Sequence, residues 1–104
     1  MKTKEQLKRG AVRFIVNELA PKLPAWKAIA VEAFAPQVVE AKLGEFFSGG
    51  ILAGTPFVQG EHLNEEEAYR AIKEAASGRW PFELFGFQFS ESDLDRLYQY
   101  IREA

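Results

Sequence analysis

The sequence contains no cysteine, which excludes disulfide bonds, thiolate nucleophiles and zinc or iron–sulfur sites with cysteine ligands. It contains a single histidine, His62, so a metal site built from several histidines is excluded as well. The remaining composition is ordinary for a globular protein: 104 residues, 47% hydrophobic and 27% charged, with a net charge of −2. This length fits one domain, and we predict a single globular domain over residues 1–104.

Long apolar runs are also missing. The longest uncharged run covers residues 46–60, and its fifteen residues include four glycines and Pro56. A membrane-spanning helix needs about 20 apolar residues, so no transmembrane segment is predicted. The first residues lead into an amphipathic pattern rather than an apolar core, and no signal peptide is evident. We therefore expect a protein of the cytoplasm.

The first half of the chain predicts two helices. Thr3 and Gln6 form a capping box that opens the first helix, which we expect to end near Ala20. Residues 24–47 also have helical spacing, but they are apolar nearly all round, which is typical of a central helix covered by other elements or by a partner chain. Pro36 predicts a kink or break in this long helix.

The second half predicts a loop, two further helices and a hairpin. Residues 48–62 are rich in glycine and are expected to be loop. Asn64 caps a third helix that stops at Gly78, and Ser90 with Asp93 caps the last one. Between these helices, alternating aromatic residues predict a short antiparallel hairpin in which Phe82 pairs with Phe89 and Leu84 with Phe87. The predicted fold class is therefore mainly α (α+β), with about four helices and one short hairpin near residues 80–89.

Catalytic and cofactor sites are not indicated by the sequence. His62 precedes Glu65 and Glu66, but one imidazole beside solvent-facing carboxylates is more typical of a surface loop than of a metal site. The glycine-rich stretch lacks the lysine of a phosphate-binding loop, and the serines have loop or capping positions with no evident base. We predict a protein that is not an enzyme, with no catalytic residues, no cofactor and no metal.

Charge is distributed unevenly along the chain. Residues 1–27 contain seven lysines and arginines against two glutamates, a net charge of +5, so the remainder carries −7. A basic first helix is suited to contact phosphates, with Lys2, Lys8, Arg9 and Arg13 as candidate nucleic-acid contacts. The simpler interpretation is a solvated face that balances an acidic body. Ends of opposite sign also permit self-association.

Aromatic residues are concentrated near the C-terminus, where seven of the fourteen lie between Trp80 and Tyr100. Most of them belong in the core, but the apolar segment 24–47 and this cluster together exceed what four helices and a hairpin can cover. The candidate interface residues are therefore the apolar side chains least explained by the helix faces: Ile51, Leu52, Trp80, Phe85 and Tyr100. A third hypothesis is peripheral membrane association through the uncharged segment 46–58.

Three segments resemble a known group of proteins: KLPAW at 22–26, TPFVQ at 55–59 and FSESDLDRLYQYI at 89–101. In their order they resemble small uncharacterised proteins encoded by bacteriophages and prophages of Gram-positive bacteria. Residues 60–63 and the hairpin are shorter than in that pattern. The resemblance carries no enzymatic activity and no functional residues. It implies a phage-type accessory or structural component made in the bacterial cytoplasm.

The leading hypothesis from the sequence is a non-catalytic interaction protein that self-associates. The central apolar helix and the aromatic C-terminal region are expected to form the contact, so the partner is a second copy of the chain or another protein. Nucleic-acid binding by the basic first helix is the alternative.

Overall fold

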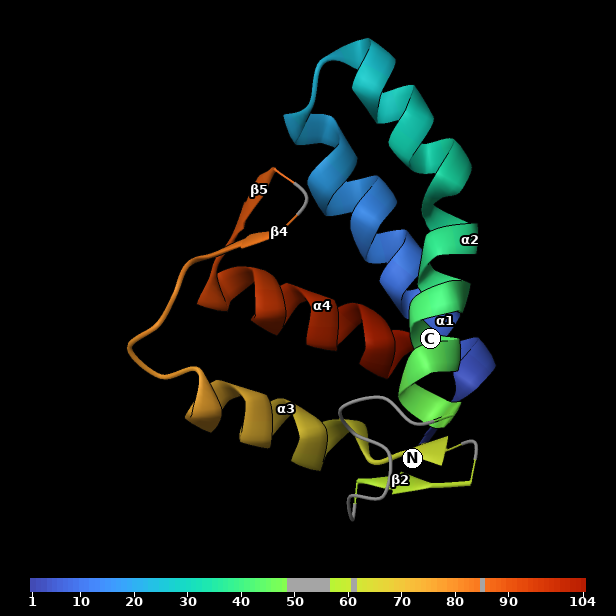
Figure 1. Ribbon diagram of the computed structural model, residues 1–104, viewed down its shortest axis with the longest axis vertical. Helices are drawn as coiled ribbons and strands as arrows, with labels where there is room; N and C mark the ends of the chain where they lie inside the picture. The colour runs from blue at the N-terminus through green and yellow to red at the C-terminus, as the bar shows by residue number, and fades with distance from the viewer. Residues whose placement is uncertain (49–56, 61, 85) are drawn as a thin grey trace.

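The computed structural model describes residues 1–48, 57–60, 62–84 and 86–104 of the chain (Figure 1). It confirms the predicted class, since most of the described residues are helical and the strands are short and antiparallel. In chain order the elements are β1 (Lys2–Thr3), α1 (Lys4–Phe14), the π-helical turn η1 (Ile15–Leu19), the 3-10 turn η2 (Ala20–Lys22), α2 (Ala25–Ser48), β2 (Val58–Gln59), β3 (His62–Leu63), α3 (Glu65–Ala75), β4 (Phe82–Leu84), β5 (Phe87–Phe89) and α4 (Glu91–Glu103).

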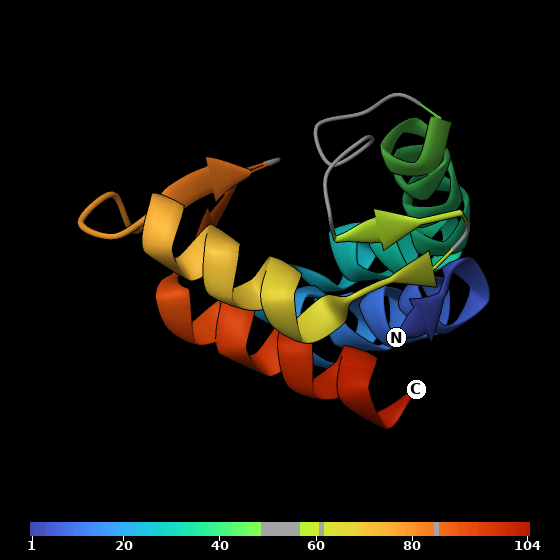
Figure 2. The same cartoon turned by 90° about the horizontal axis from the view of Figure 1, so that it is seen from below.

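The four helices pack in the spatial order α2, α1, α4, α3, each against the next. Both views agree on this arrangement: α2 lies at one edge of the molecule, and α3 runs alongside α4 at the other (Figures 1 and 2). The expectation that segment 24–47 would be the central helix is therefore wrong within the chain. α1 is central instead, because its face carries Leu7 and Phe14, both of which are buried.

The first helix begins as the sequence predicts. Thr3 Oγ1 accepts a hydrogen bond from the Gln6 backbone N–H at 3.2 Å, and the Gln6 side chain accepts one from the Thr3 backbone N–H at 2.9 Å. Together these bonds satisfy two main-chain donors that have no partner inside the helix. The helical path continues beyond α1 through η1 and η2 to Lys22, two residues past the predicted end.

α2 is one helix of 24 residues that continues through Pro36. Its axis changes direction along its length without a break (Figure 1). Proline removes one main-chain hydrogen bond from a helix interior. Ala35 and Val39, on either side of this proline, are buried in a helix that packs against α1, η1 and η2.

A small sheet replaces part of the loop predicted for residues 48–62. β3 pairs antiparallel with β1 on one side and with β2 on the other. The Asn64 backbone N–H also donates to the Phe57 carbonyl at 2.7 Å. Two-residue strands are too short for an alternating pattern, so the sequence contained no signal for this sheet.

The C-terminal elements follow the predicted pattern closely. Asn64 caps α3 through its side-chain oxygen, and Ser90 and Asp93 form the capping box of α4. The register of β4 and β5 is the predicted one, with Phe82 opposite Phe89 and Leu84 opposite Phe87. Within the described residues, no helix is long and apolar enough to cross a bilayer.

Candidate interaction surface

The exposed side of α2 carries large apolar side chains. Trp26 is 70% exposed, Ile29 69%, Phe34 59% and Val38 46%. By the usual surface area of aromatic residues, Trp26 and Phe34 alone expose on the order of 300 Å². A whole monomer's largest apolar patch is normally about 300–600 Å². We call these four side chains the α2 outer face, and their size makes this face the candidate functional surface.

Small residues form part of the inner side of the same helix. Ala35 and Val39 are buried, and Ala28 and Val31 are half-buried, where α2 contacts α1, η1 and η2. Small side chains let two helices approach closely, but they bury little apolar area. Large apolar side chains of this helix are exposed while Ala35 and Val39 are buried, although the larger Leu43 and Phe47 are half-buried as well. The outer face is therefore unexplained by the chain's own core.

Charged groups lie at the edges of the α2 outer face. The Lys27 ammonium lies 5.2 Å from the centroid of the Trp26 ring. Farther along the helix, Lys42 Nζ lies 3.5 Å from Glu45 Oε2. On the side next to α1, Glu40 Oε2 lies 3.4 Å from Lys8 Nζ. This arrangement of an apolar centre and a charged rim is typical of protein interfaces.

Two of the five predicted interface residues are described, and both have partners inside the chain. The half-buried Trp80 ring packs edge-on against Phe82 with centroids 4.9 Å apart, and it also contacts Phe89. Tyr100 packs edge-on against Phe14 and donates its hydroxyl to Glu18 Oε1 at 3.2 Å. Ile51, Leu52 and Phe85 lie outside the described residues. Contact of this set with a partner stays a prediction.

The structure places the four predicted nucleic-acid contacts in two different environments. Lys2 donates to the main-chain carbonyls of Arg102 and Ala104 at 2.9 and 3.1 Å, and so joins the two ends of the chain. Lys8, Arg9 and Arg13 line one open groove of about 290 Å³ between α1 and α2, together with Glu5, Val12 and Pro36.

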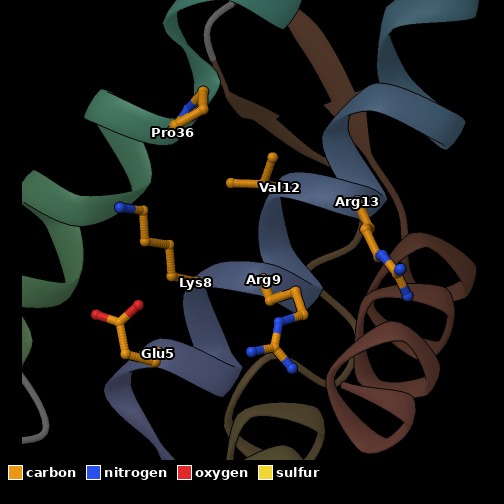
Figure 3. Close-up of a pocket in the computed structure, with 6 residues that line it drawn as sticks. All are labelled: Glu5, Lys8, Arg9, Val12, Arg13 and Pro36. Carbon is orange, nitrogen blue, oxygen red and sulfur yellow. The ribbon is translucent and has the colours of Figure 1, made fainter.

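Within that groove the three cations point in different directions. Lys8 extends toward α2, where Glu40 pairs with it, whereas Arg9 and Arg13 extend from α1 away from α2 (Figure 3). Among the described residues, neither arginine has a carboxylate within ion-pair distance. Arg9 and Arg13 are therefore the two cations of the set that are free to meet an anion.

A polar network joins α3 to α4. The Tyr69 hydroxyl donates to Asp95 Oδ1, and Lys73 Nζ lies 3.1 Å from the same oxygen. The hydrogen bond from Tyr69 lowers the pKa of Asp95, and the same bond raises the pKa of Tyr69. Tyr69 and Asp95 together raise the pKa of Lys73. All three shifts favour the ordinary charge state at neutral pH, so this network is suited to holding two helices together.

His62 lies exposed in β3, and the two neighbouring glutamates have other partners. Glu65 Oε2 lies 3.8 Å from the N-terminal ammonium, and Glu66 pairs with Arg70. In the described part of the chain, no group of three or more histidine, aspartate and glutamate side chains is placed to hold a metal ion.

The sequence pattern pointed to the helix but missed the residues of the α2 outer face. Because segment 24–47 is apolar on every side, its periodicity does not say which face meets the first helix. Residue size gives no such signal either, because Ala28 and Ala35 pack inward while Ala25, Ala30, Ala33 and Ala41 are exposed.

Comparison of the chain with protein-family models, with curated proteins and with solved structures finds no match. The resemblance to phage-encoded proteins therefore stays a prediction, and function must be argued from the surface itself.

Proposed function

We propose that this protein is a non-catalytic interaction protein that self-associates through the α2 outer face. The observation that carries the proposal is the exposure of four large apolar side chains on one helix, Trp26, Ile29, Phe34 and Val38. Covering such a surface is favourable, since each Å² of apolar area removed from water stabilises the complex by about 25 cal/mol.

A second copy of the chain is the occupant that the surface favours. Burying the α2 outer face on two chains covers roughly 1,000 Å², which is the lower range for a specific and reversible interface. Trp and other aromatic residues supply most binding energy at such contacts. The expected complex is a dimer of modest affinity with a two-fold axis, in which the same patch is used on both chains.

Replacing Trp26 and Phe34 by alanine tests this proposal. Both side chains are mostly exposed in the monomer, so the fold should persist while the dimer weakens. Loss of a buried tryptophan typically costs about 2 kcal/mol of binding, and a symmetric dimer loses two, so Trp26→Ala alone should raise the dissociation constant several hundredfold. Light scattering after size exclusion, over a concentration series and at low and high salt, measures the molar mass.

Ile72→Ala is the matched control, because Ile72 is also an exposed apolar residue but lies on α3. It should leave the dimer unchanged, and circular dichroism should show equal helix content in all variants. A wild-type chain that is monomeric at every concentration and at both salt levels would contradict the proposal. So would a double variant that stays dimeric.

Nucleic-acid binding is the second candidate function. It is supported by one observation: Arg9 and Arg13 line the groove, extend from α1 away from α2 (Figure 3) and have no acidic partner in the described residues. Cations placed one helical turn apart are suited to contact successive phosphates of a backbone.

We further propose, on the resemblance alone, that the chain is a phage-type accessory or structural component of the bacterial cytoplasm. Membrane association through segment 46–58 stays a prediction, because most of that segment lies outside the described residues. Flotation with anionic liposomes tests it directly.

A further inference from the structure

One row of exposed residues along α2 has a symmetric spacing. Lys27, Phe34, Val38 and Glu45 follow one another at intervals of seven, four and seven residues. At 3.6 residues per turn, these intervals place all four on the same side of the helix, within about 40° of one another. All four are exposed. The row therefore reads positive, apolar, apolar, negative, and its centre lies at position 36.

This row is complementary to itself when a second copy runs in the opposite direction. A two-fold axis at position 36 brings each residue opposite the one whose number completes a sum of 72. Phe34 then meets the partner's Val38, and Lys27 meets the partner's Glu45. We propose that the chain dimerises through an antiparallel α2 pair in this register. The inference rests on the proposed self-association and adds its orientation and register.

The neighbouring row fits the same register. Trp26 is the largest exposed side chain of the face; it lies about 100° around the helix from the row, on the flank where the partner carries Gly44 at a similar height. A small residue beside a large ring provides the shape complementarity that interface cores need. Apart from its chain neighbours and the backbone of its own helix, a side-chain carbon added at Gly44 would meet no described atom within 4 Å.

A parallel pair has the opposite electrostatics. It brings Lys27 against the partner's Lys27 and Glu45 against the partner's Glu45, and like charges across an interface oppose association. Charge complementarity therefore selects the antiparallel orientation, while the apolar residues supply the affinity.

Charge reversal at the two ends of the row tests the register. Lys27→Glu places two acidic residues opposite each other at both ends of the pair, and Glu45→Lys does the same with two basic residues. Each single variant should raise the dissociation constant about tenfold at low ionic strength, because two ion pairs are replaced by two repulsions. Sedimentation velocity over a concentration series measures the constant.

Recombining the charges should restore the dimer in two ways. The double variant K27E/E45K has both ion pairs again with reversed polarity, and its dissociation constant should return to within about threefold of wild type. An equimolar mixture of the two single variants should also dimerise, since one chain is then acidic at both ends and the other basic. Arg79→Glu and Glu32→Lys, which change the same charges at exposed positions outside the row, serve as controls and should have no effect.

The outcomes separate this inference from the proposed function. A wild-type chain that never dimerises overturns both. If Trp26→Ala converts the dimer to a monomer but both charge reversals leave the dissociation constant unchanged, the register is wrong and self-association still holds. If each single variant dimerises weakly and their mixture also stays monomeric, the antiparallel register is wrong. If each single variant dimerises weakly and the mixture forms a dimer, the register is supported.

Discussion

Asp93 shows how much a single buried carboxylate contributes to this fold. It is almost fully buried at the first turn of α4. Its Oδ2 accepts from the Ser90 backbone N–H at 2.9 Å, and its Oδ1 accepts from the Arg96 guanidinium at 2.9 Å and lies 3.6 Å from Lys22 Nζ. Burial by itself raises the pKa of a carboxyl, but the bonds from Ser90 and Arg96 and the charge of Lys22 outweigh it and hold the pKa of Asp93 below its ordinary value.

Replacing Asp93 by asparagine should therefore lower the free energy of unfolding in a pH-dependent way. At neutral pH we expect a loss of about 2 kcal/mol, the usual scale for charge-assisted hydrogen bonds. Because the folded pKa lies below the unfolded value of about 3.9, the contribution is complete above that pH and disappears as pH falls through the folded pKa. Urea unfolding at about pH 7 and in acid measures both. Glu103→Gln, at the exposed end of α4, is the control; an unchanged difference between D93N and wild type in acid would exclude the charge as the cause.

At the scale of elements, the features that the sequence predicted are the local ones. Helix caps at Thr3, Asn64 and Ser90 depend on residues three positions apart, and the hairpin register depends on aromatic alternation over eight residues. The features it missed depend on contacts between distant segments. The β1–β3–β2 sheet joins the two ends of the first sixty residues, and the orientation of α2 is set by α1. For this reason the sequence predicted the helix that carries the candidate surface, but not which of its side chains are exposed.

The contact between α1 and α4 contains one position where only glycine fits. A side-chain carbon at Gly10 would lie 2.8 Å from Ile101 Cα and 2.9 Å from the Tyr100 carbonyl oxygen, and both are main-chain atoms that cannot turn aside. Gly10→Ala should therefore destabilise the protein by about 1–3 kcal/mol through overpacking. Helix propensity alone predicts the opposite sign, a gain of up to about 1 kcal/mol.

Gly44→Ala is the matched control for that prediction, because it changes the same residue type inside α2. Beyond the helix itself, no described atom lies within 4 Å of the added carbon, so propensity should decide and the variant should be stabilised by about 0.5–1 kcal/mol. Thermal unfolding of both variants measures the two signs, at a concentration where the chain is monomeric and the proposed contact at Gly44 is absent. If G10A proved as stable as G44A, the close approach of α1 to α4 would be wrong.

At the scale of the whole molecule, ion pairs and hydrogen bonds within the fold occupy part of the basic charge of residues 1–27. Lys2 binds carbonyls at the C-terminus, Lys8 pairs with Glu40, and Lys22 pairs with Asp93. Two of the seven cations in residues 1–27 are therefore paired with carboxylates from later in the chain, and Lys2 is bound by carbonyl groups. An apolar surface on α2 remains available for association, and the free basic charge of the predicted set is reduced to two arginines.

The number of unpaired cations in this set predicts how strongly nucleic-acid binding depends on salt. If Arg9 and Arg13 are the cations that contact phosphates, the logarithm of the binding constant for duplex DNA should fall with the logarithm of salt concentration at a slope of about −2. Arg9→Glu with Arg13→Glu should abolish that binding, whereas Lys2→Gln should leave the slope unchanged because Lys2 already serves the C-terminal carbonyls. Fluorescence anisotropy over a salt series measures the slope. A slope near −4 would mean that four cations make contact, either because Lys2 and Lys8 leave their partners or because two chains bind together. Binding that is absent at low salt would remove this function.

With only two phosphate contacts per chain, affinity for DNA is weak unless the α2 dimer presents both pairs to one strand. Trp26→Ala should then weaken DNA binding without touching a basic residue.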